Sequence, residues 1–364
     1  MLILNVVGAR PNFMKIGPLA KEMCRRGLSQ VLVHTGQHYD ENLSRLFFDQ
    51  LGIPEPDVNL QVGSASQAVQ TSEILRRFEP VVLERCPDLV VVVGDVNSTM
   101  ACALVAAKLC VPVAHVEAGL RSFDRTMPEE INRIVTDAVS DLLFVSEPSG
   151  VRNLKREGVP DHKIHFVGNV MIDSLLEHRK AAAESNILER LGLSPESRYA
   201  LVTLHRPSNV DDPEKLRGLL QTLAELAQDL PVIFPMHPRT RSKAVEVSLQ
   251  SELGCLIVTE PLGYLEFLRL MSGAAVMITD SGGVQEETTV LGVPCLTVRE
   301  NTERPATVEQ GTNRLVGTDP ANLLRAARAV IHGDRPPSRL PELWDGKAAQ
   351  RIVEVLLQQD WRKR

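Results

Sequence analysis

The sequence has little of what marks a membrane protein, a disulfide-bonded protein or a nucleic-acid-binding protein. No apolar stretch reaches the roughly 18 residues that a membrane-spanning helix needs. The 364 residues include only six cysteines and no C-x-x-C pair, so we expect buried, reduced thiols and a cytoplasmic setting. The net charge of −6 disfavours nucleic acid and anionic membranes as partners. The opening run Met1–Val7 is apolar but has no basic start, which predicts a buried strand rather than a signal peptide.

Length and composition indicate a globular protein with two domains. A chain of 364 residues, with 43% hydrophobic and 24% charged residues, is too long for one typical core. Short runs rich in Val, Leu and Ile recur between amphipathic segments, as in strands that are buried on both faces of a parallel sheet. We expect strands at 2–7, 30–35, 89–93, 111–116, 142–146 and 164–167, with helices that include 66–85, 98–109 and 128–139. The pattern then restarts, with strands at 199–204, 231–235, 255–259, 275–279 and 294–298 and helices near 212–229, 239–251, 264–273, 282–291 and 320–332.

This repeating β-α order predicts an α/β fold with two Rossmann-like, doubly wound domains facing a cleft. We expect an N-terminal domain at 1–168, a C-terminal domain at 169–344 and a terminal segment at 345–364, whose helix would pack back on the first domain. Ligands of open α/β sheets bind at the carboxyl ends of the strands. The residues that follow each strand are therefore the candidates for a functional site.

Two cations follow the first strand. Arg10 stands in the turn Gly8-Ala9-Arg10-Pro11, and Lys15 lies one turn into the next helix. Cations at a helix start oppose the helix dipole, so a clamp for a diphosphate is favoured over two solvated surface charges.

Three carboxylates follow later strands of the first half. Asp95 ends the run 89–93, Glu117 comes after 111–116, and Glu129 opens the helix that begins at Pro128. Asp95 also fits as a helix cap, and Glu129 as a complement to the helix dipole or as an i,i+4 partner of Arg133. Taken together, the three suit general acid–base work on both faces of a sugar ring.

Histidines near cations follow two strands of the second half. His205 precedes Arg206, and His237 precedes Pro238 and Arg239. Their equivalent positions favour contact with a ligand over a purely structural role. Metal binding is disfavoured, because His34 and His38 straddle a strand end and no further ligand set accompanies them.

The most distinctive segment is Asp280-Ser281-Gly282-Gly283, between an apolar strand and a helix. Ser281 can cap the helix, and the two glycines let a phosphate approach its free N–H groups. Glu287, one to two turns further, is placed to accept from both hydroxyls of a ribose, and Arg304 is a second anion contact. Close packing of helix on strand is the alternative for the Gly-Gly pair. The segment is neither G-x-G-x-x-G nor a P-loop, so no nicotinamide cofactor is indicated.

With these residues in view, the chain closely resembles the non-hydrolysing UDP-N-acetylglucosamine 2-epimerases, nearly from end to end. The resemblance rests on motifs in a fixed order and spacing. They are Gly8-Ala9-Arg10-Pro11, Gly36-Gln37-His38, Gly94-Asp95, His115-Val116-Glu117-Ala118-Gly119-Leu120-Arg121, Pro128-Glu129-Glu130-Ile131-Asn132-Arg133, His205-Arg206-Pro207, Asp280-Ser281-Gly282-Gly283-Val284-Gln285-Glu286-Glu287 and Thr302-Glu303-Arg304-Pro305.

The resemblance implies a glycosyltransferase-B-like fold, a homodimer and a place in polysaccharide biosynthesis, with neither a metal nor another cofactor. The implied activity is C2 epimerisation of UDP-GlcNAc to UDP-ManNAc, in which UDP is eliminated to give a 2-acetamidoglucal and then added back. The implied catalytic residues are Asp95, Glu117, Glu129 and His205. The implied substrate contacts are Arg10, Lys15, Asp95, Glu117, Arg133, His205, Leu262, Phe267, Ser281, Gly282, Gly283, Glu287 and Arg304. A second UDP-GlcNAc, bound as an activator, would meet Gln37, His38, Gln67, Arg206 and His237.

The chain departs from the family pattern at a few positions. Asn12 stands where many members have Glu, and Pro207-Ser208-Asn209 follows His205-Arg206 in place of a second Arg and a Glu. The stretch before Glu129 is also shorter than in some members. Other functions compatible with the sequence are a UDP-sugar glycosyltransferase of the same fold, an epimerase for a modified UDP-GlcNAc derivative, a hydrolysing epimerase and a non-catalytic nucleotide-sugar sensor.

Overall fold

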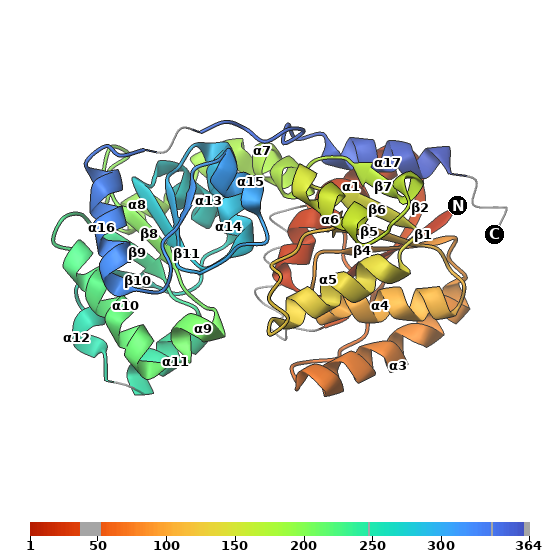
Figure 1. The fold of residues 1–364 in the computed structure, drawn as a ribbon, viewed down its shortest axis with the longest axis horizontal. Helices are drawn as coiled ribbons and strands as arrows, with labels where there is room; N and C mark the ends of the chain where they lie inside the picture. The colour runs from red at the N-terminus through yellow and green to blue at the C-terminus, as the bar shows by residue number, and fades with distance from the viewer. Residues whose placement is uncertain (37–51, 247, 336–337, 360–364) are drawn as a thin grey trace. The chain divides into compact units, whose positions relative to one another are not determined.

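The computed structural model describes residues 1–36, 52–246, 248–335 and 338–359, and it divides the chain into two compact units (Figure 1). The first unit consists of Met1–Glu177 together with Glu342–Arg364, and the second of His178–Pro341. The chain passes from the first unit to the second within helix α7 (Val170–Ala183). The sequence had suggested a boundary slightly earlier, after residue 168.

The described part of the first unit contains a seven-stranded parallel sheet in the order β3-β2-β1-β4-β5-β6-β7. Buried Val, Leu and Ile fill β4 and most of β1, as expected of strands that are covered on both faces. The strands are β1 (Leu2–Val7), β2 (Ser29–His34), β3 (Val58–Asn59), β4 (Leu89–Val93), β5 (Val113–Ala118), β6 (Leu142–Val145) and β7 (Ile164–Phe166).

Helices cover both faces of this sheet (Figure 1). On α3, Ile74, Phe78 and Val82 recur at every fourth residue and pack against the strands and α4. Helices α3, α4 and α5 lie on one face, while α17 packs on α1 at the other. The helices are α1 (Arg10–Arg25), α3 (Gln67–Arg85), α4 (Asn97–Lys108), α5 (Pro128–Val139), α6 (Pro148–Arg156), α7 and α17 (Ala348–Gln358), with a short 3₁₀ turn at Asp161–Lys163.

The described part of the second unit contains a six-stranded parallel sheet in the order β10-β9-β8-β11-β12-β13. Its core is formed by leucines of α10, which repeat with helical spacing, and by apolar residues of the strands and of α16. The strands are β8 (Ala200–Thr203), β9 (Val232–Pro235), β10 (Ile257–Thr259), β11 (Val276–Thr279), β12 (Cys295–Thr297) and β13 (Asn313–Leu315).

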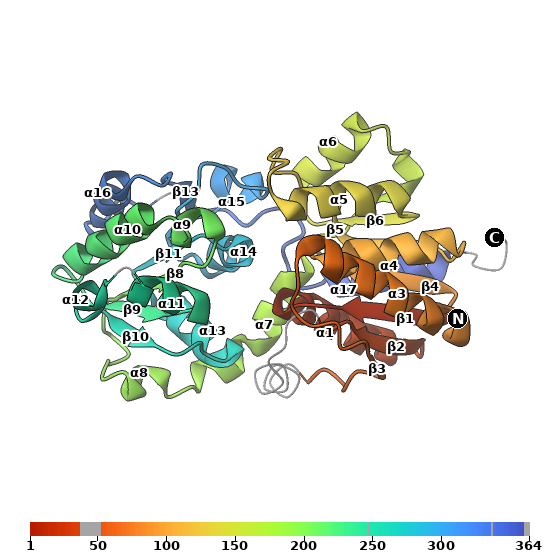
Figure 2. The ribbon, with the colours of Figure 1, turned by 90° about the horizontal axis from the view of Figure 1, so that it is seen from below.

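In this unit α10 and α16 cover one face of the sheet, and α13 and α14 the other (Figure 2). Helix α10 begins at a Pro, and the carboxylate of its N-cap, Asp212, accepts the amides of Glu214 and Lys215. The helices are α8 (Ile187–Arg190), α9 (Pro207–Val210), α10 (Pro213–Leu226), α11 (Pro238–Glu246), α12 (Gln250–Leu253), α13 (Tyr264–Gly273), α14 (Gly282–Leu291), α15 (Pro305–Glu309) and α16 (Pro320–Ile331).

Some elements differ from the sequence-based expectation. The strand predicted at 111–116 is β5, which begins and ends two residues later and so includes Glu117. The helix predicted at 239–251 is two helices, α11 and α12, and Ser248 between them has a left-handed backbone (φ 57°). The cysteines also differ from expectation: all six are free, but only Cys102 and Cys295 are buried.

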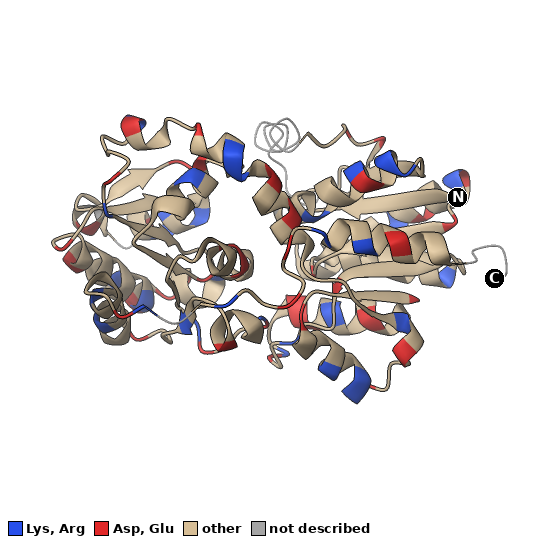
Figure 3. Cartoon of the chain, turned by 90° about the horizontal axis from the view of Figure 1, so that it is seen from above, with Lys and Arg blue, Asp and Glu red and all other residues tan. Residues whose placement is uncertain are grey.

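Charges of both signs are interspersed over the helices of each unit (Figure 3). Several form pairs one turn apart, such as Arg25 with Glu22 and Arg76 with Glu73, and exposed pairs of this kind contribute little to stability. No helix of the described ranges combines the length and the apolarity that crossing a membrane requires.

Candidate functional site

The site in the first unit is built where β1, β4 and β5 end. Glu117 lies inside β5, at a register shift between Val116 and Ala118, and not directly after the strand as expected. Its backbone is left-handed (φ 76°), which is rare for a residue other than glycine and strained. A bulge of this kind re-aims a side chain, so local backbone geometry positions the Glu117 carboxylate.

The Glu117 carboxylate forms an ion pair with Lys15, from the second turn of α1. Both residues are buried, with 6% and 4% of their surface exposed. Gly94, at the end of β4, has φ 71°, and a Cβ there would lie 2.8 Å from Lys15 Nζ. The close approach of this glycine lets the ammonium lie against the carboxylate. Lys15 is thus a buried partner of Glu117. It is not a solvated surface charge, which was the alternative interpretation of the sequence.

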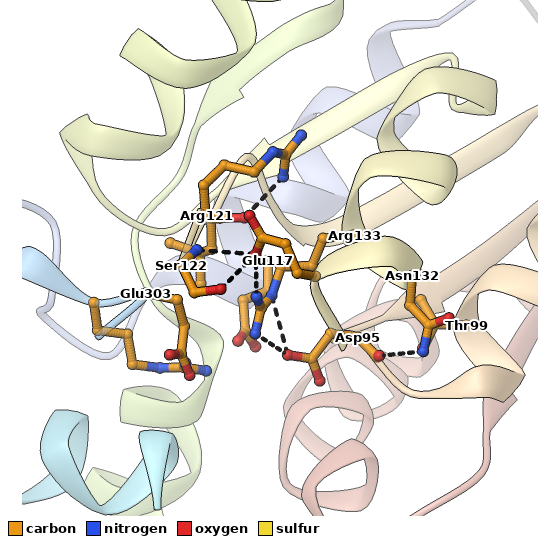
Figure 4. Close-up of polar contacts among 12 residues, drawn as sticks. Asp95, Thr99, Glu117, Arg121, Ser122, Asn132, Arg133 and Glu303 are labelled. Atoms are coloured by element: carbon orange, nitrogen blue, oxygen red, sulfur yellow. Dashed lines mark hydrogen bonds and ion pairs between the residues drawn. The ribbon is translucent and has the colours of Figure 1, made fainter. Parts of the chain in front are cut away.

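A second cation holds Asp95. Arg133 of α5 donates to Asp95 Oδ2 from Nη2 at 2.7 Å and from Nε at 3.1 Å (Figure 4). Its Nη1 pairs with Glu130 at 2.7 Å, and Arg133 itself is 2% exposed. The i,i+4 pair with Glu129 that the sequence suggested is not formed. Among the described residues Glu129 makes no ion pair and is half-buried at the start of α5.

Glu130 belongs to one of the motifs that carry the resemblance, but the sequence indicated no role for this residue. It is 1% exposed and accepts from the amides of Ser122 and Phe123, each at 2.9 Å, and from the Ser122 hydroxyl. It therefore fixes the loop between β5 and α5. Glu130, Arg133 and Asp137 recur at i, i+3 and i+7 on α5, and all are buried. Polar residues at this spacing lie on one face of the helix, and this spacing is the signal in the sequence that could have predicted a buried polar network.

His115 and Asp137 brace the ends of β4 and β5. His115 Nδ1 lies 2.6 Å from Asp137 Oδ1, and the Gly94 carbonyl accepts from Nε2 at 2.8 Å. Asp137 Oδ2 accepts the Gly119 amide and pairs with Arg121 at 2.7 Å. Burial alone would raise the pKa of Asp137, but the charges of His115 and Arg121 and their hydrogen bonds lower it below its usual range. The network thus fixes Gly94 and Gly119, which flank the two catalytic candidates.

Asn12, the departure from the family pattern, is buried beneath the same edge. Its side-chain oxygen accepts the amides of Gly8 and Ala9, and its nitrogen donates to the Val93 carbonyl at 2.9 Å. It thus ties the first turn to the end of β4. Arg10 begins α1 in this turn, and its side chain is not among the described features.

In the second unit, the carboxylate of Asp280 is fully buried and points back into the protein. It accepts from the amides of His205 and Arg206 at 3.0 and 2.9 Å and from Asn209 Nδ2 at 3.1 Å, and it lies 3.0 Å from His205 Nδ1. Burial would raise the pKa of Asp280, but the His205 ring and these donors lower it. Asp280 therefore anchors the turn after β8 and orients the His205 ring.

The N-terminus of α14 is partly exposed. Ser281 occupies the N-cap position, but its side chain makes no cap bond, contrary to the expectation. A Cβ at Gly282 would lie 2.6 Å from Arg304 Nη1, so glycine there lets the guanidinium approach the helix end. Arg304 is held by Glu286, with Nε 2.9 Å from Oε1, and by Glu303. A helix terminus beside a guanidinium is suited to an anion.

A pocket of about 160 Å³ opens in the same unit. Leu262 and Phe267, two of the substrate contacts that the resemblance implies, line it together with His205 and His237. The two imidazole rings lie 6.4 Å apart between centroids. The other lining residues are Thr203, Leu204, Pro235 and Pro261. A small, largely apolar pocket with polar groups at its rim is typical of a site for a planar ring.

Glu287 is deeply buried. It is 4% exposed and accepts from the Tyr264 hydroxyl at 2.9 Å. Burial raises the pKa of Glu287 to about 7, although the Tyr264 hydrogen bond opposes the shift. The sequence placed Tyr264 in a helix and gave it no function.

The residues expected at an activator site are placed only in part. Gln37 and His38 lie outside the described residues. Gln67 is exposed at the start of α3 and accepts from Asn97, while Arg206 donates from Nε to the Asp280 carbonyl. Within the described ranges, no group of three or more His, Cys, Asp or Glu side chains is arranged to hold a metal.

Comparison with known proteins gives consistent matches over nearly the whole chain. A family model described as UDP-N-acetylglucosamine 2-epimerase matches residues 21–357. The UDP-N-acetylglucosamine 2-epimerase of Methanocaldococcus jannaschii is 42% identical over 98% of this chain and 99% of its own. The UDP-2,3-diacetamido-2,3-dideoxy-D-glucuronate 2-epimerase of Pseudomonas aeruginosa is also 42% identical, over 98% and 99%. A crystal structure of the M. jannaschii enzyme in complex with UDP-GlcNAc and UDP covers 99% of this chain and 100% of its own, with a TM-score of 0.92. The expected glycosyltransferase-B-like α/β fold is confirmed.

Proposed function

Because the chain belongs to the UDP-N-acetylglucosamine 2-epimerase family, we propose that it interconverts UDP-GlcNAc and UDP-ManNAc. The observation that carries the proposal is the pair of carboxylates in the first unit. Asp95 follows β4, and Glu117 lies near the end of the neighbouring strand β5. Asp95 pairs with Arg133, and Glu117 pairs with Lys15. Acid–base chemistry needs such positioned groups, and the cations compensate the charge of the buried Glu117 and of the half-buried Asp95.

We propose that the reaction is an elimination followed by re-addition. A carboxylate takes the C2 proton, the C–H electron pair becomes a C1–C2 double bond, and the C1–O bond breaks with its electrons leaving on UDP. The intermediate is a 2-acetamidoglucal. UDP then adds back to C1, and a proton is delivered to the opposite face of C2. The C2 proton of UDP-GlcNAc is not beside a carbonyl group, so simple enolisation is not open to it.

In this proposal Asp95, Glu117 and Glu129 share the proton transfers. The ion pairs with Arg133 and Lys15 position Asp95 and Glu117 as proton acceptors, while Glu129 has no ion pair among the described residues. Arg133 contacts the substrate and also holds Asp95. Lys15 and Arg10 are the further substrate contacts that we propose on this unit.

The second unit would bind the leaving group. The α14 terminus, with Ser281, Gly282 and Gly283, and Arg304 would hold the diphosphate, which must not escape after the C1–O bond has broken. His205, whose Nδ1 faces Asp280, keeps Nε2 for this ligand and would assist departure of UDP. In the same unit Leu262 and Phe267 would contact the base, and Glu287 would contact the ribose.

Incubation with UDP-GlcNAc in D₂O, followed by NMR, tests the proposal. Deuterium at C2 together with UDP-ManNAc is the expected result. Free N-acetylmannosamine would indicate hydrolysis. An unchanged substrate would refute epimerisation of UDP-GlcNAc and would favour a glycosyltransferase awaiting its acceptor, or a sensor.

A modified sugar is the second candidate substrate. The observation that favours it is the P. aeruginosa relative, which acts on UDP-2,3-diacetamido-2,3-dideoxy-D-glucuronate and is as similar as the M. jannaschii enzyme. Competition of the two nucleotide-sugars in one reaction would decide between them, because the preferred substrate has the higher kcat/KM.

We further propose a homodimer and a second UDP-GlcNAc that acts as an activator, for which the resemblance implies Gln37, His38, Gln67, Arg206 and His237. Sedimentation analysis tests the dimer. A sigmoidal rate curve with UDP-GlcNAc, together with a lag from UDP-ManNAc alone, would support the activator. A hyperbolic curve would refute it.

A further inference from the structure

The hydroxyl of Tyr264 and the carboxylate of Glu287 form a buried hydrogen bond of 2.9 Å between α13 and α14. Tyr264 is 6% exposed and Glu287 is 4% exposed. Because the Tyr264 hydroxyl donates to Oε1 of Glu287, the hydrogen bond fixes the orientation of the carboxylate group. A carboxylate has about four acceptor positions, so the remaining ones stay open to other donors.

Tyr264 and Glu287 belong to the segments that form the pocket and the α14 terminus of the second unit. Tyr264 lies between Leu262 and Phe267, which line the pocket beside His205 and His237. Glu287 stands five residues after Gly282, about 7.5 Å along the helix from the terminus beside Arg304. One short segment thus supplies both the apolar pocket wall and the donor to Glu287.

We propose that Tyr264 is a positioning residue that orients the Glu287 carboxylate for the ribose hydroxyls of a nucleoside diphosphate. This inference rests on the proposed function, since it requires that the pocket takes the base and that the α14 terminus takes the diphosphate. Tyr264 does not touch the reacting atoms. It holds Oε1, so that Oε2 can accept from the ribose.

The charges around Glu287 give the inference a pH signature. Burial raises the pKa of Glu287 to about 7, and the Tyr264 hydrogen bond opposes this rise. The ring of His178, from α7, lies against the Tyr264 ring with 6.1 Å between centroids, and the neighbouring Glu286 pairs with Arg304. The ionised form of Glu287 accepts from the ribose, so affinity for UDP should fall as the pH drops below about 7. Loss of the Tyr264 hydroxyl should move that decline to higher pH.

Titration calorimetry on the full chain tests this with UDP and with 2′,3′-dideoxy-UDP. We expect Tyr264→Phe to weaken UDP binding roughly tenfold, the scale of one hydrogen bond to a charged group, and to leave dideoxy-UDP binding within about twofold. The decline of UDP affinity in acid should also begin at a higher pH in Tyr264→Phe. In turnover, KM should rise while kcat changes little.

Tyr199→Phe is the matched control. It removes another buried tyrosine hydroxyl, one that donates at 2.7 Å to the carbonyl of Leu270 in the same helix α13. It should lower stability without changing the ratio of UDP to dideoxy-UDP affinity. Equal weakening of both ligands by Tyr264→Phe, or unchanged UDP binding, would overturn the inference. Failure of the proposed function would appear in the wild type instead, as absent UDP binding or absent epimerisation.

Discussion

Replacing Lys15 by Met should destabilise the first unit by about 3–5 kcal/mol, the usual loss when one partner of a buried ion pair is removed. Met keeps most of the length of the side chain, so the main change is an uncompensated Glu117 carboxylate at 6% exposure. Urea unfolding measures this loss.

The double variant Lys15→Met/Glu117→Gln is the decisive comparison. Neither side chain is then charged, so its loss of stability should be smaller than the sum of the two single losses by at least about 2 kcal/mol. Additive losses, within about 0.5 kcal/mol, would mean that the two groups do not stabilise one another and would refute the buried pair. Arg76→Met is the control: its pair with Glu73 is exposed and screened by solvent, so its effect on stability should be much smaller than that of Lys15→Met.

The remaining predictions concern catalysis and pH. Glu117→Gln should lower kcat roughly 10²–10⁴-fold while UDP binding persists, and near-normal turnover would remove Glu117 from the mechanism. Burial raises the pKa of Asp173 to about 6, even though its carboxylate accepts the amides of Ala348 and Ala349 at the start of α17. The folded state therefore holds this proton more tightly than the unfolded chain. Its contribution, on the order of 3 kcal/mol, is present below about pH 4 and is lost as the pH rises through 6. Unfolding free energies of Asp173→Asn should lack this slope between pH 4 and 6, and an unchanged slope would assign it to other groups.

The sequence was sufficient for the layout of the fold. Runs of Val, Leu and Ile predicted the longer strands, and the residues that follow them predicted the edges where the site groups lie. The short strands β3 and β13 were not expected, because Val58–Asn59 and Asn313–Leu315 are not runs of apolar residues. The bulge at Glu117 was also missed, since a register shift depends on how β5 pairs with β6 and not on the local sequence.

Partners of charged residues were harder to predict than their positions. Lys15 and Glu117 are far apart in the sequence, and each has an ordinary local explanation. Glu129 and Glu130 are neighbours of the same type, but helical phase turns Glu130 inward against Arg133 and leaves Glu129 half-buried. The helical spacing of Glu130, Arg133 and Asp137 would have distinguished the buried Glu130 from the half-buried Glu129.

Both units place a buried layer of carboxylates behind the groups that can meet a ligand. In the first unit Asp137 and Glu130 hold the loops around the catalytic candidates. In the second unit Asp280 holds the backbone and the ring of His205. Charge at such depth is tolerated because each carboxylate accepts several hydrogen bonds or faces a cation. Asp280 therefore belongs to the most distinctive motif of the chain without being a group that binds phosphate. Its loss would act on the ligand through the position of His205, whereas a change at Gly282 would act at the helix terminus itself.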